Sequence, residues 1–194
     1  LSTRKGNMIL LDDLLDQAVM KAREIIEEKS PGLENKDEVA RQVGIGAVIY
    51  TDLSSNRIKD IDFHWDRALN FDGESGPYVQ YTHARCSSVL RKAPDFSGAA
   101  PDWNALTDDE AQARLRLISR FPDVIRDAAD KYEPSMVTRA VTDIAQAFNK
   151  YYYEHRILDG EPAEAAARVA LTDAARSVIK TGLYLIGIES PERM

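Results

Sequence analysis

The residues whose types and spacing most clearly suit the binding of a ligand are Tyr78, Tyr81 and Arg85. They fall at positions i, i+3 and i+7, so a helix would carry two aromatic rings and a guanidinium on one stripe. Such a stripe suits unstacked single-stranded bases, because rings stack on base faces and an arginine takes a phosphate or a base edge. The spacing fits at least as well two tyrosine rings half-buried in a groove between helices. Spacing alone therefore leaves both interpretations open.

The stretch NFDGES, residues 70–75, leads directly into this stripe. Gly73 supplies a flexible point, so we expect the segment to arch over the N-terminus of the following helix. Ser75, Gly76 and Pro77 are helix-start signals, because a proline at the first helical position lacks only an N–H that would have no helical partner. The sequence thus predicts a loop and a helix that act together.

The other reactive residues do not form a site that spacing can predict. His64, His83 and His155 lie far apart, and Cys86 is the single cysteine, so no metal site is predicted. No glycine-rich phosphate motif follows a strand, and no complete catalytic site can be assembled. Three consecutive tyrosines, residues 151–153, would face three directions on a helix, so at least one belongs in the core and a packing role is favoured.

Composition narrows the class of partner and the compartment. A net charge of −7 over 194 residues argues against a bulk basic surface for nucleic acid, so such a contact must depend on a local patch and on stacking. No apolar run approaches the ~20 residues of a membrane span, and no export signal opens the chain. Cys86 cannot form an internal disulfide and fits a small buried residue, so a cytoplasmic location is expected.

The elements that must position these residues are helices. Apolar residues recur with a helical period, no alternating strand pattern persists, and Pro122, Pro134 and the DGEP stretch predict breaks. Thr107 and Glu110 have the spacing of a capping box that would start a helix. The fold class is therefore predicted as an all-α helical bundle. Helices are expected near residues 11–26, 36–53, 77–93, 107–119, 122–131, 134–156 and 161–186.

Two long blocks resemble a known family. The block DFHWDRALNFDGESGPYVQYTHARCSSVLRKA resembles the start of the anticodon-binding domain of bacterial arginyl-tRNA synthetases, and the ending LYLIGIESPERM resembles that family's C-terminus. The tetrapeptide DAAR, residues 173–176, resembles the DALR signature that names this domain class, with Ala175 in place of leucine. The resemblance covers essentially the whole chain.

The opening LSTRKGN resembles the KMSKS loop of these class I enzymes, which helps to hold the phosphates of ATP. Leu1 stands where methionine is usual and Thr3 replaces the second lysine, so Arg4 and Lys5 are the candidate phosphate-binding cations. The resemblance implies a catalytic-loop set consisting of Ser2, Thr3, Arg4, Lys5 and Gly6.

The resemblance also implies a tRNA site, in which an Ω-shaped loop rearranges around the anticodon, tyrosines contact its nucleotides and the chain end reaches them. Its members would be Asn70, Phe71, Asp72, Gly73, Glu74, Ser75, Tyr78, Tyr81, Arg85 and Met194. The implied partners are the anticodon loop of tRNA(Arg) and an upstream catalytic domain of the same chain.

The implied whole enzyme is an arginine–tRNA ligase that uses ATP with Mg²⁺. No H-x-G-H string of the nucleotide-binding fold occurs, so we expect this chain to be a C-terminal portion that needs no cofactor and does not aminoacylate alone. Residues 1–53 would end the catalytic part and residues 54–194 would form the anticodon-binding domain. The alternative function is a helical protein-interaction module that has lost RNA binding.

Overall fold

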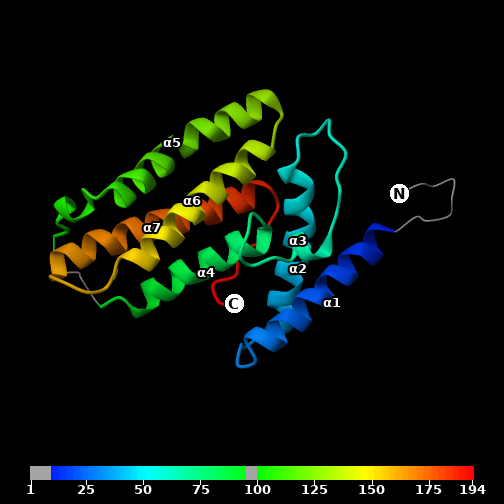
Figure 1. The fold of residues 1–194 in the computed structure, drawn as a ribbon, viewed down its shortest axis with the longest axis horizontal. Coiled ribbons are helices and arrows are strands. Elements are labelled where there is room, and N and C mark those ends of the chain that lie inside the picture. Colours follow the sequence, from blue (N-terminus) through cyan, green and yellow to red (C-terminus); the bar gives the residue numbers. More distant parts are fainter. Residues whose placement is uncertain (1–9, 95–99) are drawn as a thin grey trace.

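The computed structural model describes residues 10–94 and 100–194, and in these ranges it contains helices and no strand. The all-α bundle predicted from the sequence is confirmed (Figure 1). Within the same ranges, no helix has both the length and the apolar character that a membrane span requires. The elements are α1 (Leu11–Lys29), α2 (Lys36–Ser54), α3 (Trp65–Ala68), α4 (Gly76–Lys92), the 3₁₀ helix η2 (Trp103–Leu106), α5 (Asp109–Lys131), α6 (Ser135–Glu154) and α7 (Pro162–Leu185).

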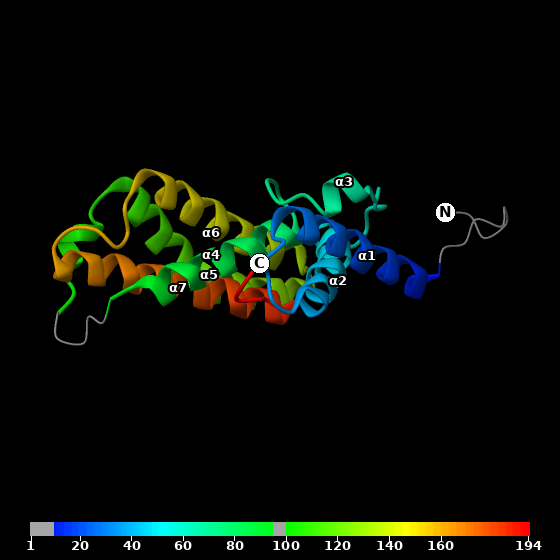
Figure 2. The same cartoon turned by 90° about the horizontal axis from the view of Figure 1, so that it is seen from below.

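The helices form two packed groups. Helices α4 to α7 lie alongside one another and share one core, in which Phe148 and Ile179 are fully buried (Figure 2). Helices α1 and α2 pack as an antiparallel pair around Ala22 and Val43 at one end of that bundle. Helix α2 also contacts α4 and α6, so it joins the pair to the bundle.

Helix α5 differs from the prediction because Pro122 does not break it. The helix runs without interruption from Asp109 to Lys131 with Pro122 inside it. A proline removes one helical hydrogen bond, here to the carbonyl of Ile118. Pro122 lies on the exposed side, where water can bind that carbonyl, while Phe121 and Ala128 are buried and hold both halves on the bundle. The predicted break was wrong because this packing outweighs one lost bond.

The N-terminus of α5 also differs from the predicted capping box. Asp108, and not Thr107, caps the helix, because its carboxylate accepts the backbone N–H of Ala111 at 2.7 Å. The Thr107 hydroxyl instead donates to the carbonyl of Asn104 at 3.0 Å, which closes the preceding 3₁₀ turn. Helices α6 and α7 agree with their predicted ranges to within two residues.

The α1–α2 pair depends on a close approach of the two backbones. A Cβ atom on Gly44 of α2 would lie 2.6 Å from the backbone nitrogen of Val19 and 2.7 Å from the carbonyl of Ala18 in α1. Backbone atoms cannot rotate away as a side chain can. Glycine at this position therefore sets the distance between the helices.

Gly44→Ala should destabilise the protein by about 1–3 kcal/mol, because overpacking outweighs the higher helix propensity of alanine. Urea unfolding followed by circular dichroism measures this change. Gly32→Ala is the matched control, since a Cβ there meets nothing within 4 Å. If Gly44→Ala were as stable as Gly32→Ala, the close approach would not constrain the pair.

Candidate nucleic-acid interface

The loop of residues 70–75 is tied to the start of α4. The Asn70 side chain accepts the backbone N–H of Asp72 at 2.8 Å, which tightens the turn. The Ser75 hydroxyl donates to the carbonyl of Asn70 and accepts the backbone N–H of Tyr78 at 3.2 Å. The expected helix start at Ser75 and Pro77 is confirmed. One serine thus closes the loop and caps the helix that bears the tyrosines.

Asn149 of α6 positions the stripe of α4. Its amide nitrogen donates to the Tyr78 hydroxyl at 3.0 Å and to the Thr82 hydroxyl at 2.9 Å. Its amide oxygen accepts a hydrogen bond from the Arg85 guanidinium at 2.5 Å. Tyr78 is half-buried against the core, whereas Tyr81 is 37% exposed. Of the two predicted rings, Tyr81 is the more accessible to a ligand.

Three tyrosine rings surround the guanidinium of Arg85. Its central carbon lies 4.8 Å from the ring centre of Tyr81, 5.2 Å from that of Tyr152 and 5.6 Å from that of Tyr153. These are cation–π distances. Together with the hydrogen bond that Arg85 donates to Asn149, they favour a role for Arg85 in holding the rings in place.

The consecutive tyrosines divide between core and surface, as their spacing predicted. Tyr151 is fully buried, whereas Tyr152 is 40% and Tyr153 is 77% exposed. The prediction that at least one would lie in the core is confirmed. The two exposed rings extend the aromatic surface that begins at Tyr81.

A groove of about 670 Å³ runs past these rings, and we call it the basic groove. Its aromatic wall contains Tyr81 and Tyr152, and its charged side chains come from three segments of the chain. They are Arg85, Arg91 and Lys92 of α4, Arg156 after α6 and Arg193 of the C-terminal segment, with one acidic side chain, Asp159. A protein of net charge −7 thus gathers positive charge at one place.

A smaller cavity of about 240 Å³, the base-sized pocket, adjoins the groove. Its apolar walls are formed by Ile25 and Ile26 of α1, Phe71 and Met194, and its polar groups belong to Lys29, Ser30 and Asp72. Tyr81, Arg85 and Met194 line both cavities. These three side chains therefore form the boundary between the groove and the pocket.

The C-terminal segment reaches the groove because α4 holds its backbone. Gln80 donates to the carbonyl of Glu189 at 2.7 Å, and Arg91 donates to that of Glu192 at 3.1 Å. Between them, Nδ1 of the fully buried His83 lies 3.0 Å from the carbonyl of Pro191. This backbone attachment places Met194 between the two cavities.

The sequence-predicted set is only partly assembled in this way. Phe71, Asp72, Tyr81, Arg85 and Met194 line the two cavities, whereas Asn70, Ser75 and Tyr78 shape the loop and helix behind them. Gly73 and Glu74 line neither cavity. The loop set Ser2, Thr3, Arg4, Lys5 and Gly6 lies outside the described residues.

Sequence reasoning missed the contribution of α1 and of the α6 end. The helical pattern predicts Ile25 and Arg156 only as parts of the helices 11–26 and 134–156, and it gives neither of them, nor Lys29 and Ser30, a place in the site. The proximity of these residues to α4 arises from tertiary packing. The one signal that could have indicated Arg156 is its position just after the exposed tyrosines.

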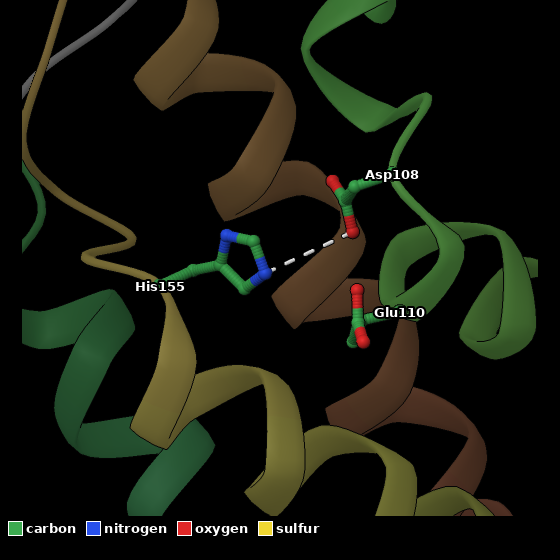
Figure 3. A group of neighbouring side chains, drawn as sticks. All are labelled: Asp108, Glu110 and His155. Carbon is green, nitrogen blue, oxygen red and sulfur yellow. Dashed lines mark ion pairs between the residues drawn. The ribbon is translucent and has the colours of Figure 1, made fainter.

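Three side chains that are not grouped in the sequence lie close together in the structure: Asp108, Glu110 and His155 (Figure 3). Their spacing along the chain did not predict this proximity. Their ligand-type atoms lie within 4.8 Å of one another. Glu110 already accepts from Lys150 at 3.1 Å, Asp108 caps α5, and the His155 ring stacks on Tyr151 at 4.1 Å. We therefore interpret this cluster as a helix cap with ion pairs.

The part of the helical bundle that bears the groove belongs to the helical anticodon-binding class, as its match to a family model shows. Residues 79–194 match the family described as "DALR anticodon binding domain". Residues 1–65 match the family described as "tRNA synthetases class I (R), catalytic domain". The chain belongs to the DALR anticodon-binding domain family, because that match covers more than half of its length.

Several curated proteins and solved structures are similar to this chain. Arginine–tRNA ligases of Halothermothrix orenii and Alkaliphilus metalliredigens are 50% and 52% identical to it and match it over its whole length. The chain spans 34% of the length of each of these relatives. Arginyl-tRNA synthetase of Thermus thermophilus superposes with a TM-score of 0.89 at 34% identity, over 96% of this chain and 32% of that one.

The buried His83 makes the attachment of the C-terminal segment sensitive to pH. Burial, opposed by the Pro191 carbonyl and assisted by Arg176 and Lys180, holds the pKa of His83 below its usual value. The unfolded chain therefore binds a proton more readily, and stability should fall as pH drops below ~6.5, the ordinary histidine pKa. Thermal melting between about pH 7 and about pH 5.5 measures this loss.

His83→Asn is the matched variant, because its amide can donate to the same carbonyl but does not titrate. It should lose less stability than the parent over the same pH interval. Equal losses in the two proteins would mean that His83 is not the group responsible.

Proposed function

We propose that this chain recognises the anticodon loop of tRNA(Arg) as part of an arginine–tRNA ligase. The observation that carries the proposal is the shared boundary of Tyr81, Arg85 and Met194 between a basic groove and a base-sized pocket. Single-stranded RNA is bound by stacking of splayed bases on aromatic rings beside positive charge. Aromatic rings and positive charge occur together at this site, although the chain as a whole has a net negative charge.

The two cavities suggest how the nucleotides of the anticodon loop are distributed between the pocket and the groove. One unstacked base would enter the base-sized pocket, where Ile25, Phe71 and Met194 offer apolar contact to its faces. The carboxylate of Asp72 can accept a hydrogen bond from an amino group on the base edge. A neighbouring base would stack on the exposed face of Tyr81 while its backbone lies in the basic groove.

The activity proposed for the whole enzyme follows from its relatives, which are named arginine–tRNA ligases. It would activate arginine with ATP and Mg²⁺ and transfer it to tRNA(Arg) in the cytoplasm. Residues 1–53, with Ser2 to Gly6 at the ATP phosphates, would end the catalytic part, and residues 54–194 would form the anticodon-binding domain. The catalytic domain of the same chain is thus its second proposed partner.

Tyr81→Ala should weaken binding of a tRNA(Arg) transcript by about 1–3 kcal/mol, the range for loss of one base–aromatic stack. Fluorescence anisotropy titration measures the affinity, and circular dichroism checks that the variant is folded. Tyr184→Ala is the matched control, because this ring is 79% exposed on α7 and lines neither cavity.

The opposite result would support the alternative function. If Tyr81→Ala lost stability but bound tRNA(Arg) as the parent does, the ring would have a packing role. If the parent failed to bind tRNA(Arg) at low and at moderate salt, the domain would fit a protein-interaction module instead.

The 194-residue chain alone should show no arginine-dependent exchange of pyrophosphate into ATP. The described ranges contain helices only, and so offer no nucleotide fold against which residues 2–6 could hold ATP. The measurement is incorporation of labelled pyrophosphate with and without arginine. Incorporation above the arginine-free background would contradict this expectation.

A further inference from the structure

The basic groove extends well beyond the tyrosines that would bind bases. Arg91 and Lys92 lie in the last turn of α4, Arg156 follows the end of α6, and Arg193 is in the C-terminal segment. Tyr81 and Lys92 are eleven residues apart on one helix, which corresponds to roughly 16 Å at ~1.5 Å per residue. The positive charge therefore continues along the groove, away from the base-sized pocket.

Contacts within the fold do not neutralise this charge. Arg91, Lys92 and Arg193 make no ion pair with any described residue, whereas Arg23, Arg41, Arg126, Arg168 and Arg176 each pair with an acid. Arg156 pairs with Asp159 at 3.3 Å, but the two side chains are 88% and 62% exposed. An exposed pair of this kind contributes little to stability, so an anionic ligand can displace it.

Stabilisation of a helix end can explain the positions of only two of these four cations. Arg91 and Lys92 can stabilise the C-terminal end of α4 through its dipole. Arg156 and Arg193 lie outside the last turn of any described helix, where that interaction is strongest. Convergence of like charges from three segments does not stabilise a fold, because the charges repel one another. The arrangement instead fits a polyanion that occupies the groove.

We infer that Arg91, Lys92, Arg156 and Arg193 form a phosphate-binding rail for consecutive phosphates of the RNA strand that adjoins the bases bound at Tyr81. This inference rests on the proposed tRNA-binding function and adds to it a contact that does not read sequence. Successive phosphates of one strand advance by ~3.4 Å along the axis of a B-form duplex and lie further apart in an unstacked strand, so a stretch of roughly 16 Å has room for more than one. The rail sets affinity and orientation, while the pocket reads bases.

The test is the variant Lys92→Gln/Arg156→Gln/Arg193→Gln in the 194-residue chain, since glutamine keeps a polar stem and removes the charge. Arg91 is left in place because it also holds the C-terminal segment. Its affinity for tRNA(Arg) and for a non-cognate transcript should fall by the same factor. The slope of log K against log[salt] should become shallower by about 2–3 units, because three fewer counterions are released.

The matched control is Arg116→Gln/Arg120→Gln/Lys59→Gln, which removes the same charge from exposed positions that line neither cavity. It should leave the slope within about one unit of the parent, so that any larger change reports the groove itself. Circular dichroism checks that both triple variants are folded.

The outcomes separate the rail from the proposed function. If Tyr81→Ala weakens binding but the rail variant behaves like its control in affinity and slope, the rail is wrong and tRNA recognition stands. A rail variant that loses affinity only for tRNA(Arg), and not for the non-cognate transcript, also overturns the rail, because its contact would then read sequence. Failure of every transcript to bind the parent would reject the proposed function itself.

Discussion

The buried polar side chains of α4 are the constraint on which the rest of this structure depends. Gln80, Thr82 and His83 are fully buried, and an unpaired buried polar group costs about 1–3 kcal/mol. Gln80 donates to the carbonyls of Gln42 in α2 and Glu189 in the C-terminal segment, while Thr82 accepts from Asn149 of α6. Hydrogen bonds of the buried side chains of α4 therefore fix three other segments around it. The groove and the pocket lie where these segments meet.

A second buried group supports the aromatic side of the groove. Arg114 is fully buried, and its guanidinium lies 3.7 Å from the ring centre of Tyr151 with no hydrogen-bond partner among the described residues. Burial lowers the pKa of Arg114 to about 10. His155 stacks on the same tyrosine at 4.1 Å. Tyr151 is thus fixed in the core by two neighbours, and the next two tyrosines of α6 project outward around Arg85.

Charge segregation explains how an acidic chain can present a surface for RNA. Most acidic side chains that form ion pairs do so on the outer faces of helices, as Glu27 does with Arg23 and Lys36. The hydrogen bonds from these two cations hold the pKa of Glu27 at about 2, so this pairing persists through the physiological range. Positive charge gathers in the basic groove, where the end of α4, the chain after α6 and the C-terminal segment converge. Net charge is therefore a poor guide to the local potential of this protein.

The sequence alone determined the helices, the loop-to-helix start at Ser75 and the long family block, because helical periodicity and caps act between residues a few positions apart. It misjudged Pro122, since burial of Phe121 on the bundle outweighs one lost hydrogen bond. Only the tertiary structure decided that Lys29 and Met194 meet beside Tyr81, and which tyrosine stays exposed. The physical reason is that long-range packing and the pairing of buried polar groups bring these segments together, and no local pattern encodes those contacts.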